Sequence, residues 1–162
     1  MKIFTLLLLL IIGQEVMSEE VNIVFVPLPS ESIAQMDNQR EYVSTLVSKY
    51  FQKQVITKSE SDFELIQFIV NENILKPEQS WELQSLGVVL GDALAAEIDG
   101  LSWWQVTDEY GTDAVLRYKQ TTLQIGAKTM ISKRVENGSE VDVKHMYFLL
   151  KDFVETKSNE YR

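Results

Sequence analysis

The sequence predicts an α+β fold, in which a helical N-terminal half is packed with a three-stranded antiparallel β-meander and a C-terminal helix. Two observations lead to this prediction. Before residue 99 and after residue 142, apolar residues recur at three and four positions, which is the period of an amphipathic helix. Between these stretches, residues 102–125 place apolar side chains at alternate positions, which is the period of a strand.

Three helices are expected in the N-terminal half, after a short strand within residues 21–26. The first follows the stiff Pro27-Leu28-Pro29 link, with Ser30 as its cap. The second follows a capping segment at residues 59–62, and the third begins at Pro77 and continues to residue 98. The first helix buries an apolar stripe, made of Ile33, Met36, Val43, Leu46, Val47 and Tyr50.

One face of the third helix carries almost no side chains. Gly87, Gly91 and Ala95 are spaced four apart and therefore share a face. Two glycines inside a helix cost roughly 1–2 kcal/mol relative to alanine, so a strand or second helix is expected to approach this face closely. Asp92 and Glu97 interrupt the apolar run, which excludes a membrane dimerisation motif.

The first hairpin is predicted by matching the apolar faces of two strands. The match places Val106 opposite Leu116 and Asp108 opposite Ala114. It leaves a three-residue loop around Gly111, which is free to adopt a positive φ. Asp108 then falls on the apolar side, where it needs a partner or a place at the sheet edge.

The paired tryptophans point to opposite faces of this sheet, because side chains alternate along a strand. Trp104 is assigned to the core and Trp103 to the opposite, mixed face. If no helix covers the mixed face, it forms a recognition patch; the alternative is that a helix or the N-terminal strand covers it. The candidate binding residues are Trp103, Gln105, Asp108, Glu109, Arg117 and Lys119 on the sheet, and Lys133 and Arg134, which either bind an anion or pair with nearby acids.

The chain after the hairpin contains a third strand at residues 121–125 and an ambiguous segment at 130–135, either strand or short helix. Asp142 is expected to cap the last helix. The single α+β domain is predicted to span residues 30–156, and residues 157–162 form a polar tail.

The N-terminus has the pattern of a secretory signal. Lys2 precedes a short apolar run, and small residues before position 19 suit cleavage after Ser18. Residues 1–18 are therefore predicted to be a signal peptide and 19–29 an extended segment; an uncleaved anchor is the alternative. The expected location is periplasmic or secreted, with no membrane association after cleavage.

Charge and composition restrict the function classes. A net charge of −9 opposes nucleic acid and anionic lipid, and favours basic partners or simple solubility. The sequence has no cysteine, so thiol catalysis is excluded, and it has one histidine, His145. Carboxylates at Asp108, Glu109 and Asp113 flank the hairpin loop, but their spacing does not match a calcium loop. No cofactor or metal site is predicted.

Several short motifs together resemble the bacterial family called domain of unknown function 3806. They are Met36 with Gln39-Arg40, Leu83-Gln84 with Leu86-Gly87 and Gly91-Asp92, Trp103 with Asp108-Glu109 and Gly111, Leu116-Arg117, and Met130-Ile131-Ser132-Lys133-Arg134. The resemblance implies a bacterial source and one continuous domain. It supplies no reaction, ligand or catalytic residue.

Three functions remain open. The first is a non-catalytic periplasmic module that binds a protein partner of the cell envelope. The second is a small carboxylate-dependent hydrolase of envelope polymers, with Asp108 or Glu109 as acid or base. The third is an acidic inhibitor of a basic secreted enzyme. The absence of a catalytic constellation favours the first.

Overall fold

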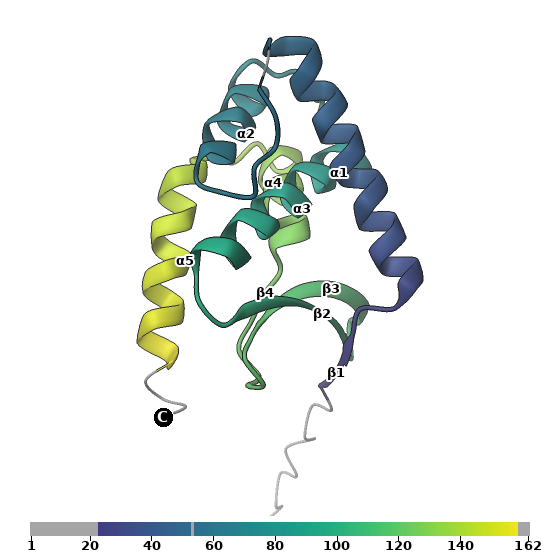
Figure 1. Cartoon of the computed structure of the whole chain (residues 1–162), viewed down its shortest axis with the longest axis vertical. Helices are drawn as coiled ribbons and strands as arrows, with labels where there is room; N and C mark the ends of the chain where they lie inside the picture. The colour runs from purple at the N-terminus through teal and green to yellow at the C-terminus, as the bar shows by residue number, and fades with distance from the viewer. Residues whose placement is uncertain (1–22, 53, 159–162) are drawn as a thin grey trace, which may run out of the picture.

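The computed structural model describes residues 23–52 and 54–158 (Figure 1). This part of the chain contains five helices and four strands. In chain order they are β1 (Val24–Pro27), α1 (Ser30–Tyr50), α2 (Ser61–Asn71), α3 (Ser80–Glu97), β2 (Leu101–Asp108), β3 (Gly111–Tyr118), β4 (Gln124–Ile125), α4 (Ala127–Glu136) and α5 (Val143–Ser158). The predicted signal peptide lies outside the described residues.

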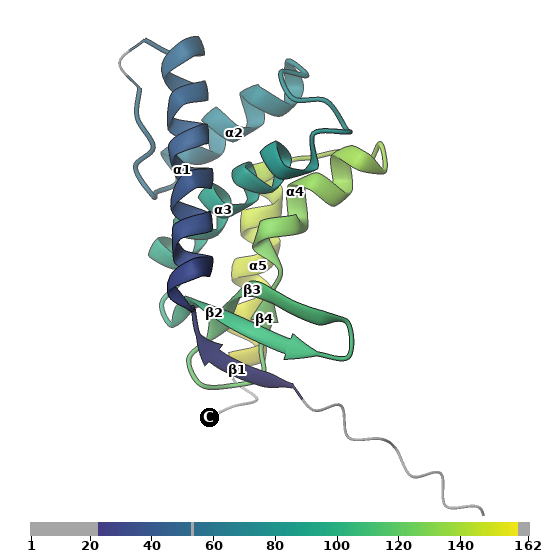
Figure 2. The same ribbon diagram turned by 90° about the vertical axis from the view of Figure 1, so that its right-hand side faces the viewer.

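The sheet has four antiparallel strands in the order β1-β2-β3-β4, so the predicted three-stranded meander was one strand short. The additional strand is β1, which pairs along β2 with Phe25 opposite Val106. The strand predicted at residues 121–125 is shorter in the structure and contains only Gln124–Ile125. The chain first turns after β3 at Lys119, whose φ is +50°. In Figures 1 and 2, α1, α3 and α4 lie on one side of the sheet, and no described helix crosses the other side.

The hairpin register differs from the prediction by three residues. Val106 lies opposite Asp113, and Trp103 lies opposite Leu116. An odd shift in register exchanges the two faces of one strand relative to the other. Trp103 therefore faces the helices and Trp104 faces away from them, which reverses the predicted assignment. The predicted three-residue loop is wrong, because Gly111 pairs with Asp108 and leaves only Glu109 and Tyr110 between the strands. Gly111 does take a positive φ, +123°.

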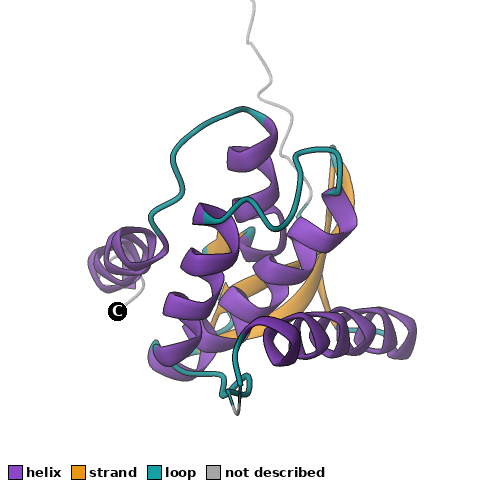
Figure 3. Ribbon diagram, turned by 90° about the horizontal axis from the view of Figure 1, so that it is seen from above, coloured by secondary structure: helices purple, strands orange, loops and turns teal. Residues whose placement is uncertain are grey.

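Helix α3 lies at the centre of the helical layer (Figure 3), and its glycine face allows two close contacts. A Cβ atom at Gly87 would lie 2.1 Å from the backbone oxygen of Lys128 in α4. A Cβ atom at Gly91 would lie 2.2 Å from the ring of Trp103. The expected close approach is confirmed, and the neighbours are the first turn of α4 and one indole ring.

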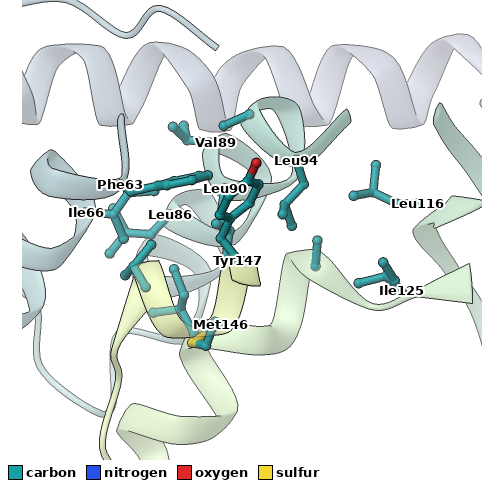
Figure 4. Packing of buried hydrophobic residues seen from close by; sticks show 14 of the residues in the cluster. Phe63, Ile66, Leu86, Val89, Leu90, Leu94, Leu116, Ile125, Met146 and Tyr147 are labelled. Atoms are coloured by element: carbon teal, nitrogen blue, oxygen red, sulfur yellow. The ribbon is translucent and has the colours of Figure 1, made fainter. Parts of the chain in front are cut away.

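The main core surrounds the rest of α3, which is buried on all sides from Ser85 to Leu94. Leu86, Val89, Leu90 and Leu94 are buried there. Figure 4 shows them beside side chains from α2, the sheet and α5, including Phe63, Ile66, Leu116, Ile125, Met146 and Tyr147. The rings of Phe63 and Tyr147 are 5.1 Å apart, and this contact joins α2 to α5.

Of the smaller predictions about segment 130–135 and the helix caps, some are confirmed and one is wrong. The ambiguous segment 130–135 is helical and belongs to α4. Asp142 caps α5 as predicted, because its Oδ1 accepts the backbone N–H of His145 at 2.8 Å. Ser30 does not cap α1; the capping position is Pro29, which has no side-chain acceptor. Among the described helices, none combines the length and apolar character needed to cross a membrane.

Candidate functional site

The candidate binding residues on the sheet do not form one surface, which corrects the predicted mixed face. Trp103 packs against the core on the helix side of the sheet. Gln105 shares that side, whereas Arg117 points to the helix-free side with Trp104. Glu109 is exposed in the turn between β2 and β3. The physical cause is the odd register shift described above.

Trp103 belongs to a hydrogen-bonded junction of three elements. Its Nε1 donates to Asp92 Oδ1 at 2.9 Å. Asp92 also accepts from Arg40, at 2.6 Å from Nε and 2.8 Å from Nη2. The hydrogen bond to Asp92 raises the pKa of Arg40. The Asp92 side chain is only 5% exposed, so this carboxylate holds α1, α3 and β2 together and is not accessible to a ligand.

Gln105 ends in a small polar pocket of about 160 Å³ between α1, β2, β3 and α4. Ser32 Oγ donates to Gln105 Oε1 at 3.4 Å, which is a long contact. Beside it, Lys128 Nζ and Asp113 Oδ1 form an ion pair at 2.8 Å. Asp113 is thus paired with a base and does not act together with the other hairpin carboxylates.

Arg117 is stacked between two aromatic rings on the helix-free side of the sheet. Its guanidinium carbon lies 4.2 Å from the ring centre of Phe25 and 4.9 Å from that of Trp104. Nε and Nη2 donate to the backbone oxygens of Thr121 and Gln120. Arg117 therefore joins β1 and β2 to the turn after β3.

The remaining candidates stand apart from one another. Asp108 Oδ1 accepts the backbone N–H of Tyr110 at 2.8 Å and so stabilises its own turn. Lys119 lies over the ring of Tyr118, 4.9 Å from its centre. Lys133 is exposed on α4, whereas Arg134 donates to the oxygen of Met130 in the same helix. These residues do not converge on a shared site.

A further cavity lies elsewhere, between α2 and the segment that connects α4 to α5. We call it the α2 groove. Its volume is about 1220 Å³, and its apolar lining includes Phe63, Phe68, Leu83, Leu86 and Val135. The sequence does not reveal this groove, because its walls come from residues about seventy positions apart and only packing brings them together.

One amide holds the two walls of the α2 groove together. Gln67 Nε2 donates to the oxygen of Val141 at 2.8 Å, and Gln67 Oε1 accepts the N–H of Val143 at 2.8 Å. The same Nε2 also donates to Asn71 Oδ1. The bonds fix the α4–α5 connection against α2. Gln67 lies beside the apolar stripe of α2, which is a weak sequence signal.

The rim of the α2 groove is acidic. Glu60 and Glu64 come from the α2 wall, and Glu140 and Asp142 from the opposite wall. Lys144 is the basic residue of the lining, and its Nζ lies 3.6 Å from Glu60 Oε1. Among the described residues, no group of three or more histidine, aspartate or glutamate side chains could hold a metal ion. The groove therefore combines an apolar lining with a negative rim.

Comparison with known proteins supports the fold and the family. Among solved structures, the chain is similar to a protein of Bacteroides thetaiotaomicron VPI-5482, with a TM-score of 0.72 and 22% sequence identity over 81% of this chain. It spans 48% of that protein, so the likeness concerns the fold of about half of it. No curated protein matches the sequence.

The family comparison covers the region that contains most of the groove. Residues 62–147 match the family described as Domain of unknown function (DUF3806). This range holds α2 from its second residue onward, α3, β2, β3, β4, α4 and the beginning of α5. The motifs quoted from residues 83–134 lie inside it, whereas Arg40 and β1 lie outside. The chain therefore belongs to the DUF3806 family.

Proposed function

We propose that this protein is an exported, non-catalytic module of the cell envelope that binds a polypeptide segment of a partner protein in the α2 groove. The observation that carries the proposal is the groove itself, with its volume of about 1220 Å³ and its lining of apolar and charged side chains. Ligand sites are typically concave and mostly apolar, with a few polar groups that orient the ligand. The volume exceeds the usual range for small-molecule pockets, which favours a chain segment.

The alternative of a carboxylate-dependent hydrolase has less support. Acid–base catalysis requires two carboxyl groups beside a substrate pocket. Asp108 is bonded to its own turn and Glu109 is exposed at the tip of the hairpin. Neither lines the α2 groove or the small polar pocket. An acidic inhibitor of a basic enzyme is compatible with the groove, because it is a special case of partner binding.

Export can be tested independently of binding. The proposal holds that residues 1–18 direct secretion and are then removed, so that the mature chain begins at Glu19. Full-length protein produced in a Gram-negative host is expected in the periplasmic fraction, with a mass that lacks those residues. Intact mass with membrane retention would indicate the uncleaved anchor, and cytoplasmic retention would contradict export.

A neutral apolar dye tests whether the groove is open to ligands. N-phenyl-1-naphthylamine is expected to gain fluorescence on binding the groove. Ser139 is exposed and lines the groove, so Ser139→Trp should obstruct it without disturbing the core. Thr45→Trp, at an exposed position on α1, is the matched control. Equal dye binding by both variants would contradict the proposal.

The helix-free side of the sheet is the second candidate surface, favoured by the half-buried rings of Phe25 and Trp104 around Arg117. Crosslinking to a partner separates the two candidates. Recognition by the sheet predicts that Trp104→Ser loses the crosslink and Ser139→Trp keeps it. Recognition by the α2 groove predicts the reverse.

A further inference from the structure

We propose that the α2 groove selects segments in which lysine or arginine alternates with apolar residues. This inference rests on the groove being the binding site, as proposed above, and adds the chemistry of its occupant. Three observations support it. Both walls of the groove carry carboxylates, the ammonium group of Lys144 already lies against the carboxylate of Glu60, and apolar side chains line the space between the walls.

The carboxylates face the groove from two separate elements. Glu64 lies on α2, and Glu140 lies on the connection between α4 and α5. Both are exposed, and neither has an ion-pair partner among the described residues. A cation placed between the walls would gain attraction from both sides. An anionic ligand would be repelled from both sides.

Lys144 provides an example of an ammonium group next to a carboxylate of the groove. It projects from α5, and its ammonium nitrogen lies 3.6 Å from Glu60 Oε1 at the start of α2. Glu64 follows four residues later, and positions four apart lie on the same face of a helix. The wall therefore has a first carboxylate beside the protein's own ammonium and a second one turn along, where a ligand ammonium can make the same contact.

The apolar lining requires apolar side chains in the same ligand. The accessible apolar side chains of the lining are Phe68, Val70 and Val135, whereas Leu83 and Leu86 of α3 are buried in the core. Lysine and arginine also bury their aliphatic stems on apolar surface while the charged ends stay in water. An alternation of apolar and basic side chains therefore satisfies the apolar lining and the rim together. The net charge of −9 would additionally steer a basic segment toward the protein.

Three synthetic peptides test the inference by fluorescence anisotropy with a neutral label. One alternates Leu and Lys, one alternates Leu and Glu, and one alternates Ser and Lys. Only the Leu/Lys peptide is expected to bind at low salt, and its affinity should fall as salt screens the charges. Equally tight binding of the Leu/Glu peptide, or of the Ser/Lys peptide, would overturn the proposed specificity.

Charge-matched variants test whether the attraction for the Leu/Lys peptide comes from the carboxylates of the groove. Glu64→Gln with Glu140→Gln removes two charges from the groove, and Glu41→Gln with Glu109→Gln removes two exposed charges elsewhere. The first pair should weaken Leu/Lys binding about tenfold, which corresponds to two partly exposed charge pairs, and the second by less than about twofold. Equal losses in both would mean that the general field, not the groove, attracts the peptide, and would refute the inference.

The dye experiment tests separately whether the groove binds a ligand and whether that ligand alternates basic and apolar residues. If Ser139→Trp blocks the neutral dye but the Leu/Lys peptide does not bind, the groove is a binding site and its occupant has a different chemistry. If the dye does not distinguish Ser139→Trp from Thr45→Trp, the groove proposal and this inference fail together. Displacement of the dye by the Leu/Lys peptide would support both.

Discussion

At the scale of single residues, Asp92 makes the most consequential polar contacts. It accepts hydrogen bonds from Arg40 and Trp103 while almost fully buried. In Asp92→Asn the amide group has no acceptor, and Arg40 keeps only the exposed carboxylate of Asp37 as a countercharge. Breaking a buried ion pair typically costs about 3–5 kcal/mol, and the partial exposure of Arg40 places the expected loss near the lower end.

Urea denaturation measures this loss. Asp37 also bonds Arg40, at 2.8 Å, but its side chain is 64% exposed. Asp37→Asn is therefore the control and should cost less than about 1 kcal/mol. Similar losses in the two variants would mean that the junction around Asp92 contributes little to stability.

Gly91 illustrates a glycine that is required for packing and not for backbone conformation. Alanine would improve the helix by about 1 kcal/mol in isolation. In the protein, its Cβ would collide with the Trp103 ring, which Asp92 holds in place. Gly91→Ala is expected to destabilise by about 1–3 kcal/mol, as overpacking does.

Gly126 provides the comparison for Gly91. A Cβ there would meet its nearest atom, Thr129 Oγ1, at 3.8 Å, which is an ordinary contact. Gly126→Ala should therefore shift the thermal unfolding midpoint only slightly. A Gly91→Ala protein with a midpoint as high as that of Gly126→Ala would contradict the packing account.

At the scale of elements, the helix-free side of the sheet depends on Arg117. Its flat guanidinium group stacks on two rings and bonds two backbone oxygens, a combination that lysine cannot reproduce. Arg117→Lys should lose about 1–2 kcal/mol in chemical denaturation. Arg134→Lys, at a position that bonds one helical oxygen and no ring, should lose clearly less. Comparable losses would count against the stack.

Elements with a strong local pattern were predictable, and pairings between them were not. Helical periodicity correctly identified α1, α2, α3 and α5, because this periodicity is a local feature of the sequence. In α1 the predicted stripe was only partly right, since Ile33 and Tyr50 are exposed. The hairpin register failed because both registers bury apolar residues: Trp103 with Leu116 is as good a match as Val106 with Leu116. The segment 130–135 was ambiguous because its apolar run is short.

At the scale of the whole molecule, β1 completes the sheet across a long sequence distance. It covers the edge of β2 and supplies the Phe25 ring to Arg117. A chain that begins at Leu28 should therefore melt lower than one that begins at Glu19, and should self-associate through the uncovered strand. Thermal unfolding and sedimentation velocity check the two effects. Equal melting and monomeric behaviour would show that β1 is dispensable.

The α2 groove is also a property of the whole molecule, and it could not be predicted from the sequence. Its acidic residues were individually visible, but Glu64 and Glu140 are joined only by the packing of α2 against the α4–α5 connection. The Asp92 junction was missed for the same reason: Arg40 and Asp92 are 52 positions apart.

The hydrogen bonds made by Gln67 allow ligand binding in the α2 groove to be detected by amide exchange. Because this side chain bonds the connection at Val141 and Val143, a segment that competes for the amide would release the α4–α5 connection from α2. The amide proton of Val143 would then exchange with solvent faster. Deuterium uptake at that position would thus distinguish ligands that break these hydrogen bonds from those that rest above them.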